Sequence, residues 1–276
     1  MNRNALPFAG LVLLTALLGG CGGNDVRDGA PRSGSAAIPK LPPDAVPKPE
    51  PRSRYGNGPV YEVFGQSYSV MESSAGYRER GVASWYGTKF HGNLTSNREP
   101  YDMYAMTAAH KSLPLPTYVR VRNLRNNKSV VVRVNDRGPF AHNRIIDLSY
   151  SAALKLGMIR DGTTLVEVEA ISFDEPRGDR PVRKTIAAPA PAEPQPIVEN
   201  TVFAQIGAFG DRGNAERRLA TLRSAGIGTG FVVEDTSTSP PLYRVRVGPI
   251  RDVTQYDLLV EELDKLGIAD PYLVTE

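Results

Sequence analysis

The chain has 276 residues with 33 basic and 30 acidic side chains, which give a formal net charge of +3. This length allows two modest domains, and so small a charge argues against a protein that binds nucleic acid through a basic surface. The chain has a single cysteine, which excludes an internal disulfide.

Residues 1–20 have the pattern of a secretory signal peptide. Arg3 precedes an apolar run from Ala5 to Leu18. This run is too short to span a bilayer, and its length is typical of a signal sequence that is removed after export. We therefore expect the protein to be exported.

Cys21 follows the apolar run directly. This position is typical of a lipobox, in which the cysteine becomes the acylated first residue of the mature protein; the alternative is an incidental thiol in a signal peptide that is cut elsewhere. Several acyl chains such as palmitate on one residue would anchor the protein firmly, because a single chain binds a bilayer only marginally. Gly22 stands where an aspartate retains similar lipoproteins in the inner membrane, so we expect an outer-membrane lipoprotein that faces the periplasm.

Two proline-rich stretches divide the rest of the chain. The first has eight prolines between residues 21 and 59 and predicts a semi-extended tether over 21–54. The second, at 174–200, predicts a linker between two domains. The domains expected from these boundaries cover residues 55–173 and 201–276.

The first domain is predicted to be mainly β. Short apolar or alternating segments, separated by Gly, Pro and Asn, predict six strands at Val82–Tyr86, Tyr104–Ala109, Tyr118–Leu124, Val130–Asn135, Arg144–Leu148 and Thr164–Ile171. One short helix is expected between Ser149, as its N-cap, and Gly157 at its end. Six strands and one helix suit a small closed barrel.

Asp136 is the strongest candidate for a catalytic acid. It lies where the β-branched run from Val130 to Val134 breaks into the turn at Gly138-Pro139. A rigid strand would therefore present this carboxylate at the edge of a loop, where catalytic groups often lie. An aspartate that merely begins a turn is the alternative interpretation.

Several motifs of this domain occur in order along residues 55–173. They are Gly81–Gly87, Lys89–Gly92, Tyr101–Lys111, Asn135–Phe140 and Arg144–Ser149. Together they resemble the rare lipoprotein A family. The resemblance implies a six-stranded double-psi β-barrel, a fold shared with expansins and with some lytic transglycosylases, and it implies endolytic cleavage of the glycan strands of peptidoglycan.

The same resemblance implies roles for four side chains. Cleaving a glycosidic bond requires a proton for the leaving oxygen, and Asp136 matches the acid and base of this chemistry. A single carboxyl suffices in a lytic transglycosylase, because the C6 hydroxyl of the sugar attacks C1 and forms a 1,6-anhydro ring. Glu99, Asp102 and His110 match positions needed for activity, where they would set the polarity of the site and hold the sugar.

The chain departs from the family pattern at Arg98, which replaces the usual glycine before Glu99. An arginine cannot adopt every backbone conformation that is open to glycine. A displaced Glu99 would reduce activity or alter the substrate preference.

The sequence predicts no cofactor and no metal site. The histidines His91, His110 and His142 lie too far apart for a helical zinc motif, and no second cysteine is present. The chain also lacks a Gly-x-Ser-x-Gly elbow and a phosphate-binding loop, which excludes serine hydrolase and nucleotide-dependent chemistry. Trp85 is interpreted as a core residue rather than a sugar platform.

The second domain is predicted to be α+β with the order βαββαβ. Its strands are expected at Val202–Phe209, Gly230–Glu234, Leu242–Pro249 and Pro271–Val274, and its helices at Asn214–Ala225 and Thr254–Leu266. The motifs resemble the SPOR domain, which implies binding of glycan strands stripped of stem peptides. The same resemblance implies glycan contacts at Gln205, Ala208, Leu242 and Arg244.

Strand alternation places Val245 and Val247 against the helices and Arg244 on the open face. RNA-binding modules share this topology. The segment 201–276 lacks their aromatic stacking motif, however, and carries 8 basic and 11 acidic residues. Binding of nucleic acid is therefore not expected.

The barrel is the basic half, with 13 basic and 7 acidic residues over 80–173, which suits an anionic wall polymer. We expect an enzyme of the division septum that cleaves stripped strands during daughter-cell separation, in functional cooperation with the amidases that strip them. The alternative is a non-catalytic factor that binds or loosens the wall with the same barrel. Products that end in 1,6-anhydro sugar would distinguish the two.

Overall fold

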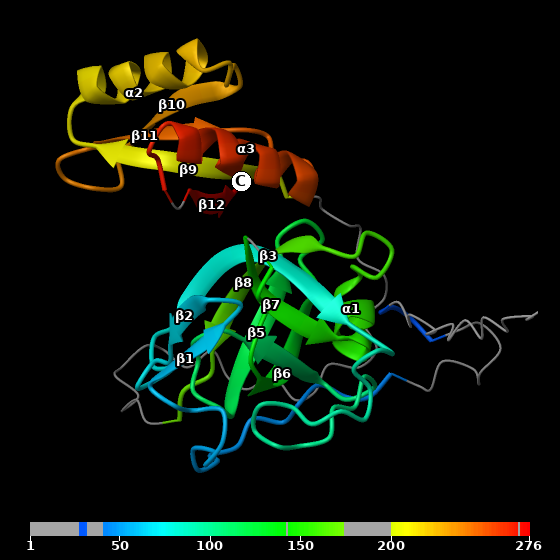
Figure 1. Cartoon of the computed structure of the whole chain (residues 1–276). Helices are drawn as coiled ribbons and strands as arrows, with labels where there is room; N and C mark the ends of the chain where they lie inside the picture. The colour runs from blue at the N-terminus through cyan, green and yellow to red at the C-terminus, as the bar shows by residue number, and fades with distance from the viewer. Residues whose placement is uncertain (1–27, 32–40, 142, 174–199, 270) are drawn as a thin grey trace, which may run out of the picture.

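The computed structural model describes residues 28–31, 41–141, 143–173, 200–269 and 271–276. The expectations for the signal peptide, for Cys21, for His142 and for most of the proline-rich linker lie outside these residues. The described part forms a closed barrel, a two-stranded hairpin, and a four-stranded sheet with two helices (Figure 1). Within it, none of the helices has both the length and the apolar character needed to cross a membrane.

Six strands close the barrel, as predicted. They are β3 (Arg78–Tyr86), β4 (Thr107–His110), β5 (Thr117–Asn123), β6 (Ser129–Asp136), β7 (Arg144–Ser149) and β8 (Thr164–Ala170). Around the barrel they follow the order β3-β7-β4-β6-β5-β8. The pairs β3–β7 and β4–β6 are parallel and the other neighbours are antiparallel.

Alternating apolar side chains explain the barrel interior. In β6, Val130, Val132 and Val134 are each at most 1% exposed and pack in the barrel core. The helix α1 (Tyr150–Leu156) covers one end of the barrel. It begins after Ser149, whose hydroxyl accepts a hydrogen bond from the Ala152 amide, and it ends at Gly157 with φ +76°.

Two parts of the first domain differ from the expectation. The hairpin of β1 (Val60–Val63) and β2 (Gln66–Ser69) was not predicted, because its residues are mostly exposed and have no buried apolar run. Strand β4 begins at Thr107 rather than Tyr104. The Asp102 carboxylate accepts a hydrogen bond from the Tyr104 amide. The chain therefore forms a turn at these residues, and the strand begins only after it.

The described end of the predicted tether, residues 41–54, has no helix or strand and lies along the barrel. Glu50 forms an ion pair of 2.8 Å with Arg133 and accepts a hydrogen bond from Tyr118. Asp44 pairs with Lys155. These contacts attach the segment to the outside of the barrel.

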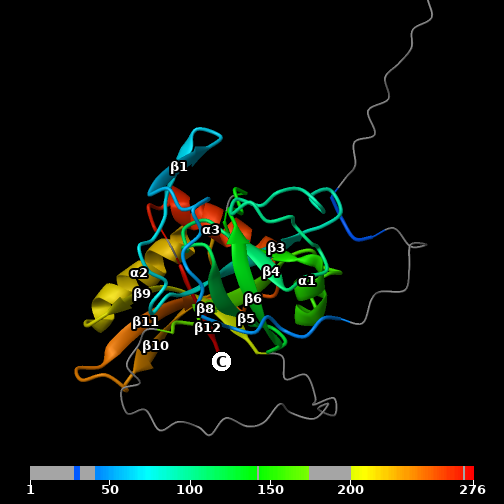
Figure 2. The same ribbon diagram turned by 90° about the horizontal axis from the view of Figure 1, so that it is seen from below.

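The second domain has the predicted order of elements. They are β9 (Val202–Phe209), α2 (Arg212–Ser224), β10 (Gly230–Asp235), β11 (Leu242–Val247), α3 (Val253–Lys265) and β12 (Tyr272–Thr275). The antiparallel sheet has the order β10-β11-β9-β12, and both helices pack on one face of it. This domain lies against the barrel near β3, as the two views in Figure 1 and Figure 2 show.

Candidate functional site

Asp136 is the last residue of β6, and one of its carboxylate oxygens is firmly held. Its Oδ1 accepts hydrogen bonds from the Ser96 amide at 2.8 Å, the Ser96 hydroxyl at 2.6 Å and the Arg137 amide at 2.7 Å. Among the described residues, none donates a hydrogen bond to Oδ2. The carboxylate is therefore fixed through one oxygen, and the other is free to exchange a proton with a ligand.

The turn that carries Ser96 also positions Glu99. Arg98 takes a left-handed backbone conformation with φ +71°, and its guanidinium lies 5.1 Å from the centre of the Tyr55 ring. The replacement of glycine thus leaves the backbone in a conformation of the type that glycine favours. Glu99 accepts hydrogen bonds from Arg133 at 2.7 Å and from the Asn135 side chain at 2.9 Å.

Glu99 remains ionised in this environment. Burial opposes its charge, but the hydrogen bonds from Arg133 and Asn135 outweigh burial and hold the pKa below its usual value. A carboxylate of this kind is a poor proton donor at neutral pH. Because Asn135 directly precedes Asp136, Glu99 instead supports the strand end that carries the candidate acid.

A cavity of about 420 Å³ is lined by two residues that hydrogen-bond Asp136, although Asp136 itself is not in its lining. These two residues are Ser96 and Arg137, and the lining also includes the aromatic residues Tyr61 and Phe140. The rings of Tyr61 and Phe140 are 6.3 Å apart in an edge-on arrangement. Aromatic rings beside a polar group suit a sugar, which has apolar faces and polar edges.

Arg137 is a rigid part of this cavity. Its guanidinium donates hydrogen bonds to the carbonyls of Gly56, His110 and Leu113 and lies 5.7 Å from the centre of the Tyr61 ring. Burial lowers its pKa to about 10, so it stays charged at neutral pH. Only its backbone amide contacts Asp136.

His110, whose carbonyl accepts one of the hydrogen bonds from Arg137, is buried with 2% of its surface exposed. Its Nδ1 accepts hydrogen bonds from the amides of Ser112 and Leu113, so the ring proton is on Nε2, which is 2.7 Å from the Tyr77 hydroxyl. Burial, followed by the charges of Arg137 and Lys111, lowers its pKa to about 3. His110 is therefore neutral, and in the described structure it makes no hydrogen bond to Asp136.

Asp102 is exposed at the turn before β4. Its Oδ1 accepts a hydrogen bond of 2.9 Å from the Tyr104 amide and lies 3.8 Å from Nδ1 of His91. Neither contact involves Asp136. Of the four predicted catalytic residues, the structure connects Glu99 with Asp136 through the Ser96 turn, whereas Asp102 and His110 contact other groups.

Asp147 is a further carboxylate near the site that the sequence analysis did not single out. Ala109 of β4 pairs with Asp136 on one side and with Asp147 on the other, so one strand separates the two acids. Burial raises the pKa of Asp147, and the Ser84 hydroxyl donates a hydrogen bond to it. Its neighbours Ile146 and Leu148 both point into the core, so strand alternation predicts that Asp147 points to the outer face. This alternation is the sequence signal that could have identified it.

Ser96, Tyr61 and Phe140 were also missed. Ser96 hydrogen-bonds Asp136 from 40 residues away, and Tyr61 and Phe140 line the same cavity as Ser96; no local sequence pattern marks such long-range contacts. Trp85, interpreted as a core residue, packs 5.7 Å from Tyr150. Among the described residues there is no group of three or more His, Cys, Asp or Glu placed to hold a metal ion.

In the second domain, the four predicted glycan contacts lie along neighbouring strands. Ala208 pairs with Arg244, while Gln205 pairs with Arg246 and Tyr272. Leu242 pairs with Asp235. Val245 and Val247 are at most 2% exposed beneath the helices, which confirms the assignment of the two faces.

Arg244 is not a free cation. Its Nε donates a hydrogen bond of 2.7 Å to Asp235, and its Nη2 lies 2.5 Å from the same carboxylate. The predicted open face therefore presents a neutralised pair rather than an isolated positive charge.

Both domains match known families. Residues 78–168 match the model described as lytic transglycolase, and residues 199–275 match the SPOR domain. The whole chain is 38% identical over 279 residues to the endolytic peptidoglycan transglycosylase RlpA of Vibrio cholerae, covering 100% of this chain and 98% of the relative. The chain belongs to the rare lipoprotein A (RlpA) family of lytic transglycosylases.

Other RlpA proteins are similar over most of their length. RlpA of Pseudomonas aeruginosa strain UCBPP-PA14 is 39% identical over 292 residues, covering 90% of this chain and 84% of the relative. RlpA of Neisseria meningitidis serogroup B is 39% identical over 221 residues, covering 78% and 83%. Both relatives are called endolytic peptidoglycan transglycosylases. The similarity to RlpA proteins thus extends over both the barrel and the second domain.

Proposed function

We propose that this chain cleaves the glycan strands of peptidoglycan endolytically, releases 1,6-anhydro ends, and prefers strands stripped of stem peptides. The observation that carries this proposal is the Asp136 carboxylate, whose Oδ1 is held by Ser96 and by the Arg137 amide, while Oδ2 accepts no hydrogen bond from the described residues. Ser96 and Arg137 also line a cavity with aromatic walls. Membership in the RlpA family supports the proposal, because the relatives are named for this activity.

The chemistry needs one carboxyl that gives and then takes back a proton. Protonated Asp136 donates its proton to the glycosidic oxygen as the bond from that oxygen to C1 breaks. The carboxylate then accepts the proton of the C6 hydroxyl, whose oxygen bonds to C1 and closes the anhydro ring. Asp136 ends in its starting state, and no water is consumed.

The neighbouring groups keep this carboxyl in place. Ser96 and the Arg137 amide fix Oδ1, which leaves Oδ2 to exchange the proton with the substrate. The rings of Tyr61 and Phe140 provide apolar surfaces on which a sugar ring packs. Glu99 stabilises the end of β6 through Asn135.

The cellular setting belongs to the same proposal. A lipid anchor on Cys21 would hold the enzyme in the outer membrane, facing the periplasm, and the apolar run before this cysteine supports that placement. The SPOR domain, with Gln205, Ala208, Leu242 and Arg244 as contacts, would carry it to strands that amidases have stripped at the septum. Replacing Cys21 by serine should move the protein from membrane fractions to the soluble periplasmic fraction.

Asp136→Asn tests the catalytic proposal. The amide is nearly isosteric and cannot supply the proton, so we expect release of anhydro products from amidase-treated sacculi to fall by at least about 100-fold. The melting temperature should stay within a few degrees of the wild-type value. Activity close to wild type would exclude Asp136 as the acid. Tight binding to sacculi without anhydro products from the wild-type protein would favour a non-catalytic wall-binding factor.

A further inference from the structure

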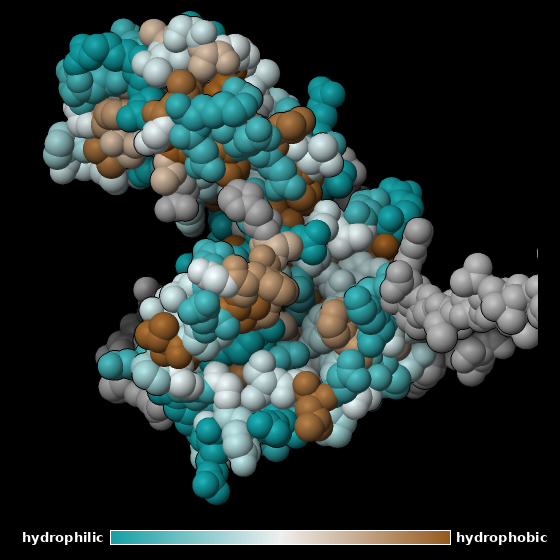
Figure 3. Space-filling view, in the orientation of Figure 1, coloured by the Kyte–Doolittle hydropathy of each residue, from teal (hydrophilic) through white to brown (hydrophobic). Residues whose placement is uncertain are grey.

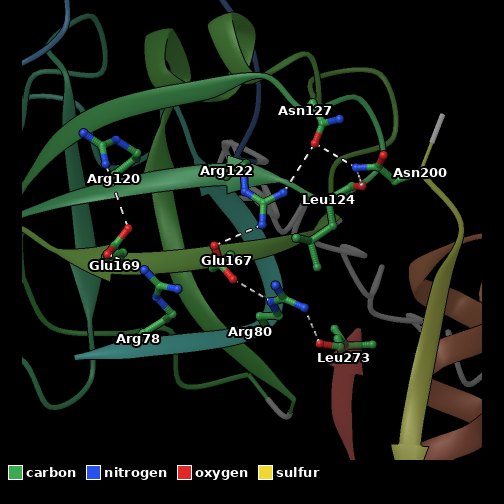
Figure 4. A network of polar contacts seen from close by, with 10 residues as sticks. All are labelled: Arg78, Arg80, Arg120, Arg122, Leu124, Asn127, Glu167, Glu169, Asn200 and Leu273. Atoms are coloured by element: carbon green, nitrogen blue, oxygen red, sulfur yellow. Dashed lines mark hydrogen bonds and ion pairs between the residues drawn. The ribbon is translucent and has the colours of Figure 1, made fainter. Parts of the chain in front are cut away.

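The two domains meet in an interface that has an apolar centre. Val82, Leu124 and Leu165, on the outside of the barrel, are at most 1% exposed and belong to the same cluster as the core of the second domain. Arg80 donates hydrogen bonds to Glu167 at 2.7 Å and, across the interface, to the Leu273 carbonyl of β12 at 2.8 Å (Figure 4). These contacts hold β12 beside β3.

A crevice of about 460 Å³ opens where the domains meet, and Figure 3 shows the surface hollowed there. Its lining comes from both domains and includes four basic and two acidic side chains: Arg78, Arg80, Lys111, Arg144, Glu79 and Asp264. Tyr272 of β12 adds an aromatic ring, over which the Arg80 guanidinium lies at 5.5 Å. An excess of positive charge with an aromatic wall suits an anionic sugar.

Three of these four cations already have partners. Arg78 pairs with Glu169 at 2.5 Å, Arg80 pairs with Glu167, and Arg144 donates a hydrogen bond to Ser84 at 2.9 Å. They are therefore engaged in holding the barrel surface and the interface.

Lys111 differs from the other three. In the described part of the chain, its ammonium makes no hydrogen bond and no ion pair within 4 Å. Burial lowers its pKa, and the more distant charges of Glu79 and Asp147 oppose this shift. A half-buried ammonium without a close partner has lost part of its hydration, so it gains from an incoming anion.

The position of Lys111 relates it to the candidate acid. It lies two residues beyond Ala109, the β4 residue that pairs with Asp136. The Cα atoms of Lys111 and Ala109 are therefore at most about 7 Å apart. Arg144, at the start of β7, lies at the same end of the barrel because β7 runs antiparallel to β4. The crevice thus adjoins the end of the barrel that carries Asp136.

We propose that this crevice, with Lys111 as its cation, binds the free lactyl carboxylate of a muramic acid residue close to the cleaved bond. The proposal rests on the proposed function and explains its substrate preference. A stem peptide is attached through that carboxyl as a neutral amide, and removal of the peptide restores the carboxylate. An ion pair with Lys111 therefore forms only with a stripped strand.

The test compares full-length wild-type protein with Lys111→Met, which removes the charge and keeps an unbranched apolar chain. The substrates are naked glycan from amidase-treated sacculi and the same glycan with its carboxyl groups chemically reduced to alcohols. A charge-assisted hydrogen bond changes kcat/KM by about tenfold or more. We therefore expect the wild-type protein to cleave naked glycan about tenfold faster than reduced glycan, and Lys111→Met to cleave naked glycan at the slower rate.

Two variants serve as controls. Lys111→Arg keeps the charge and should retain most of the preference for naked glycan. Lys128→Ala removes an exposed lysine in the turn between β5 and β6 and should behave as wild type. Melting temperatures show whether each variant is folded.

Equal rates of the wild-type protein on naked and reduced glycan would overturn the inference, even if Lys111→Met does not fold. So would a Lys111→Met variant that keeps the wild-type ratio of the two rates. A wild-type protein that cleaves neither glycan would instead overturn the proposed function.

Discussion

At the scale of single residues, His110 is connected to the candidate site only through other residues. It is neutral and buried, and its Nδ1 organises the loop from His110 to Leu113. Two carbonyls of that loop hold the Arg137 guanidinium, and Arg137 lines the cavity together with Ser96. Its contribution to activity is therefore expected to pass through Arg137 rather than through proton transfer.

The lowered pKa of His110 predicts how stability changes with pH. Unfolded histidine binds a proton below about pH 6.5, whereas folded His110 does so only near pH 3. The unfolded state is thus favoured as the pH falls from 6.5 toward 3, and stability from this group is fully present above 6.5. Between pH 7 and pH 5 the free energy of unfolding should fall by about 2 kcal/mol more in wild type than in His110→Gln.

Urea unfolding of the barrel, followed by the fluorescence of the single tryptophan Trp85, would measure this difference at both pH values. The ionisable groups common to the two proteins cancel in the comparison. Parallel declines in the two proteins would contradict a buried neutral His110.

At the scale of elements, β11 has one face that packs against the helices and one face that is turned away from them, because its side chains alternate. Val245 and Val247 face the helices, while Arg244 and Arg246 face away and pair with Asp235 and Glu276. Hydrogen bonds from Ser237 and then from Arg244 lower the pKa of Asp235 to about 2. The pair is therefore ionised at neutral pH, and a glycan would meet an Arg244 side chain that is already oriented.

If Arg244 contacts the glycan, Arg244→Ala should weaken binding. The full chain carrying Asp136→Asn, which prevents cutting, would be titrated onto amidase-treated sacculi with and without Arg244→Ala. We expect about a tenfold higher Kd, because a charge-assisted hydrogen bond at a partly solvated face is lost. Lys265→Ala, on the exposed side of α3, is the matched control. Equal affinity of the Arg244 variant and its parent would exclude Arg244 from the binding face.

At the scale of the whole molecule, the two domains are docked rather than connected only by a linker. A proline-rich linker alone would let each domain act independently. The structure instead buries Leu165 and Leu124 against the second domain, with Arg80 bridging to Leu273. The position of the SPOR domain is thereby defined relative to the barrel.

Leu165→Asp should separate the domains, because a carboxylate would face the apolar interface. Leu165 alternates with the core residue Val166, so it points outward and the barrel itself should still fold. Small-angle scattering of the full chain should show a larger radius of gyration than for wild type. Glu169→Ala, on the same outer face of β8, should leave the radius unchanged. An unchanged radius for Leu165→Asp would show that this residue does not hold the domains together.

Most strands, all three helices of the described chain and the faces of β11 could be predicted from local patterns. Alternating valines report an inside and an outside, and a capping residue such as Ser149 or a left-handed glycine such as Gly157 marks where a helix begins or ends. These signals depend on neighbours within a few residues. The exposed hairpin β1–β2 had no such signal and was missed.

The position of Asp136 at the end of a strand could be predicted from the sequence, but the contacts around it could not. Asp136 was evident from its position after a β-branched strand, whereas its partner Ser96 comes from a loop that is distant in sequence. The backbone of Arg98 was equally unpredictable, because contacts around a turn can hold a non-glycine residue at positive φ.

Length, leader pattern, strand periodicity and the acid at the end of β6 follow from the order of residues, because each depends on short-range spacing. The parallel pairing of β4 with β6, the shared neighbour Ala109 between two carboxylates, and the crevice around Lys111 depend on how the barrel closes and where the second domain docks. Those arrangements bring together residues far apart in the chain, and the buried area and hydrogen bonds that select them exist only in the folded molecule.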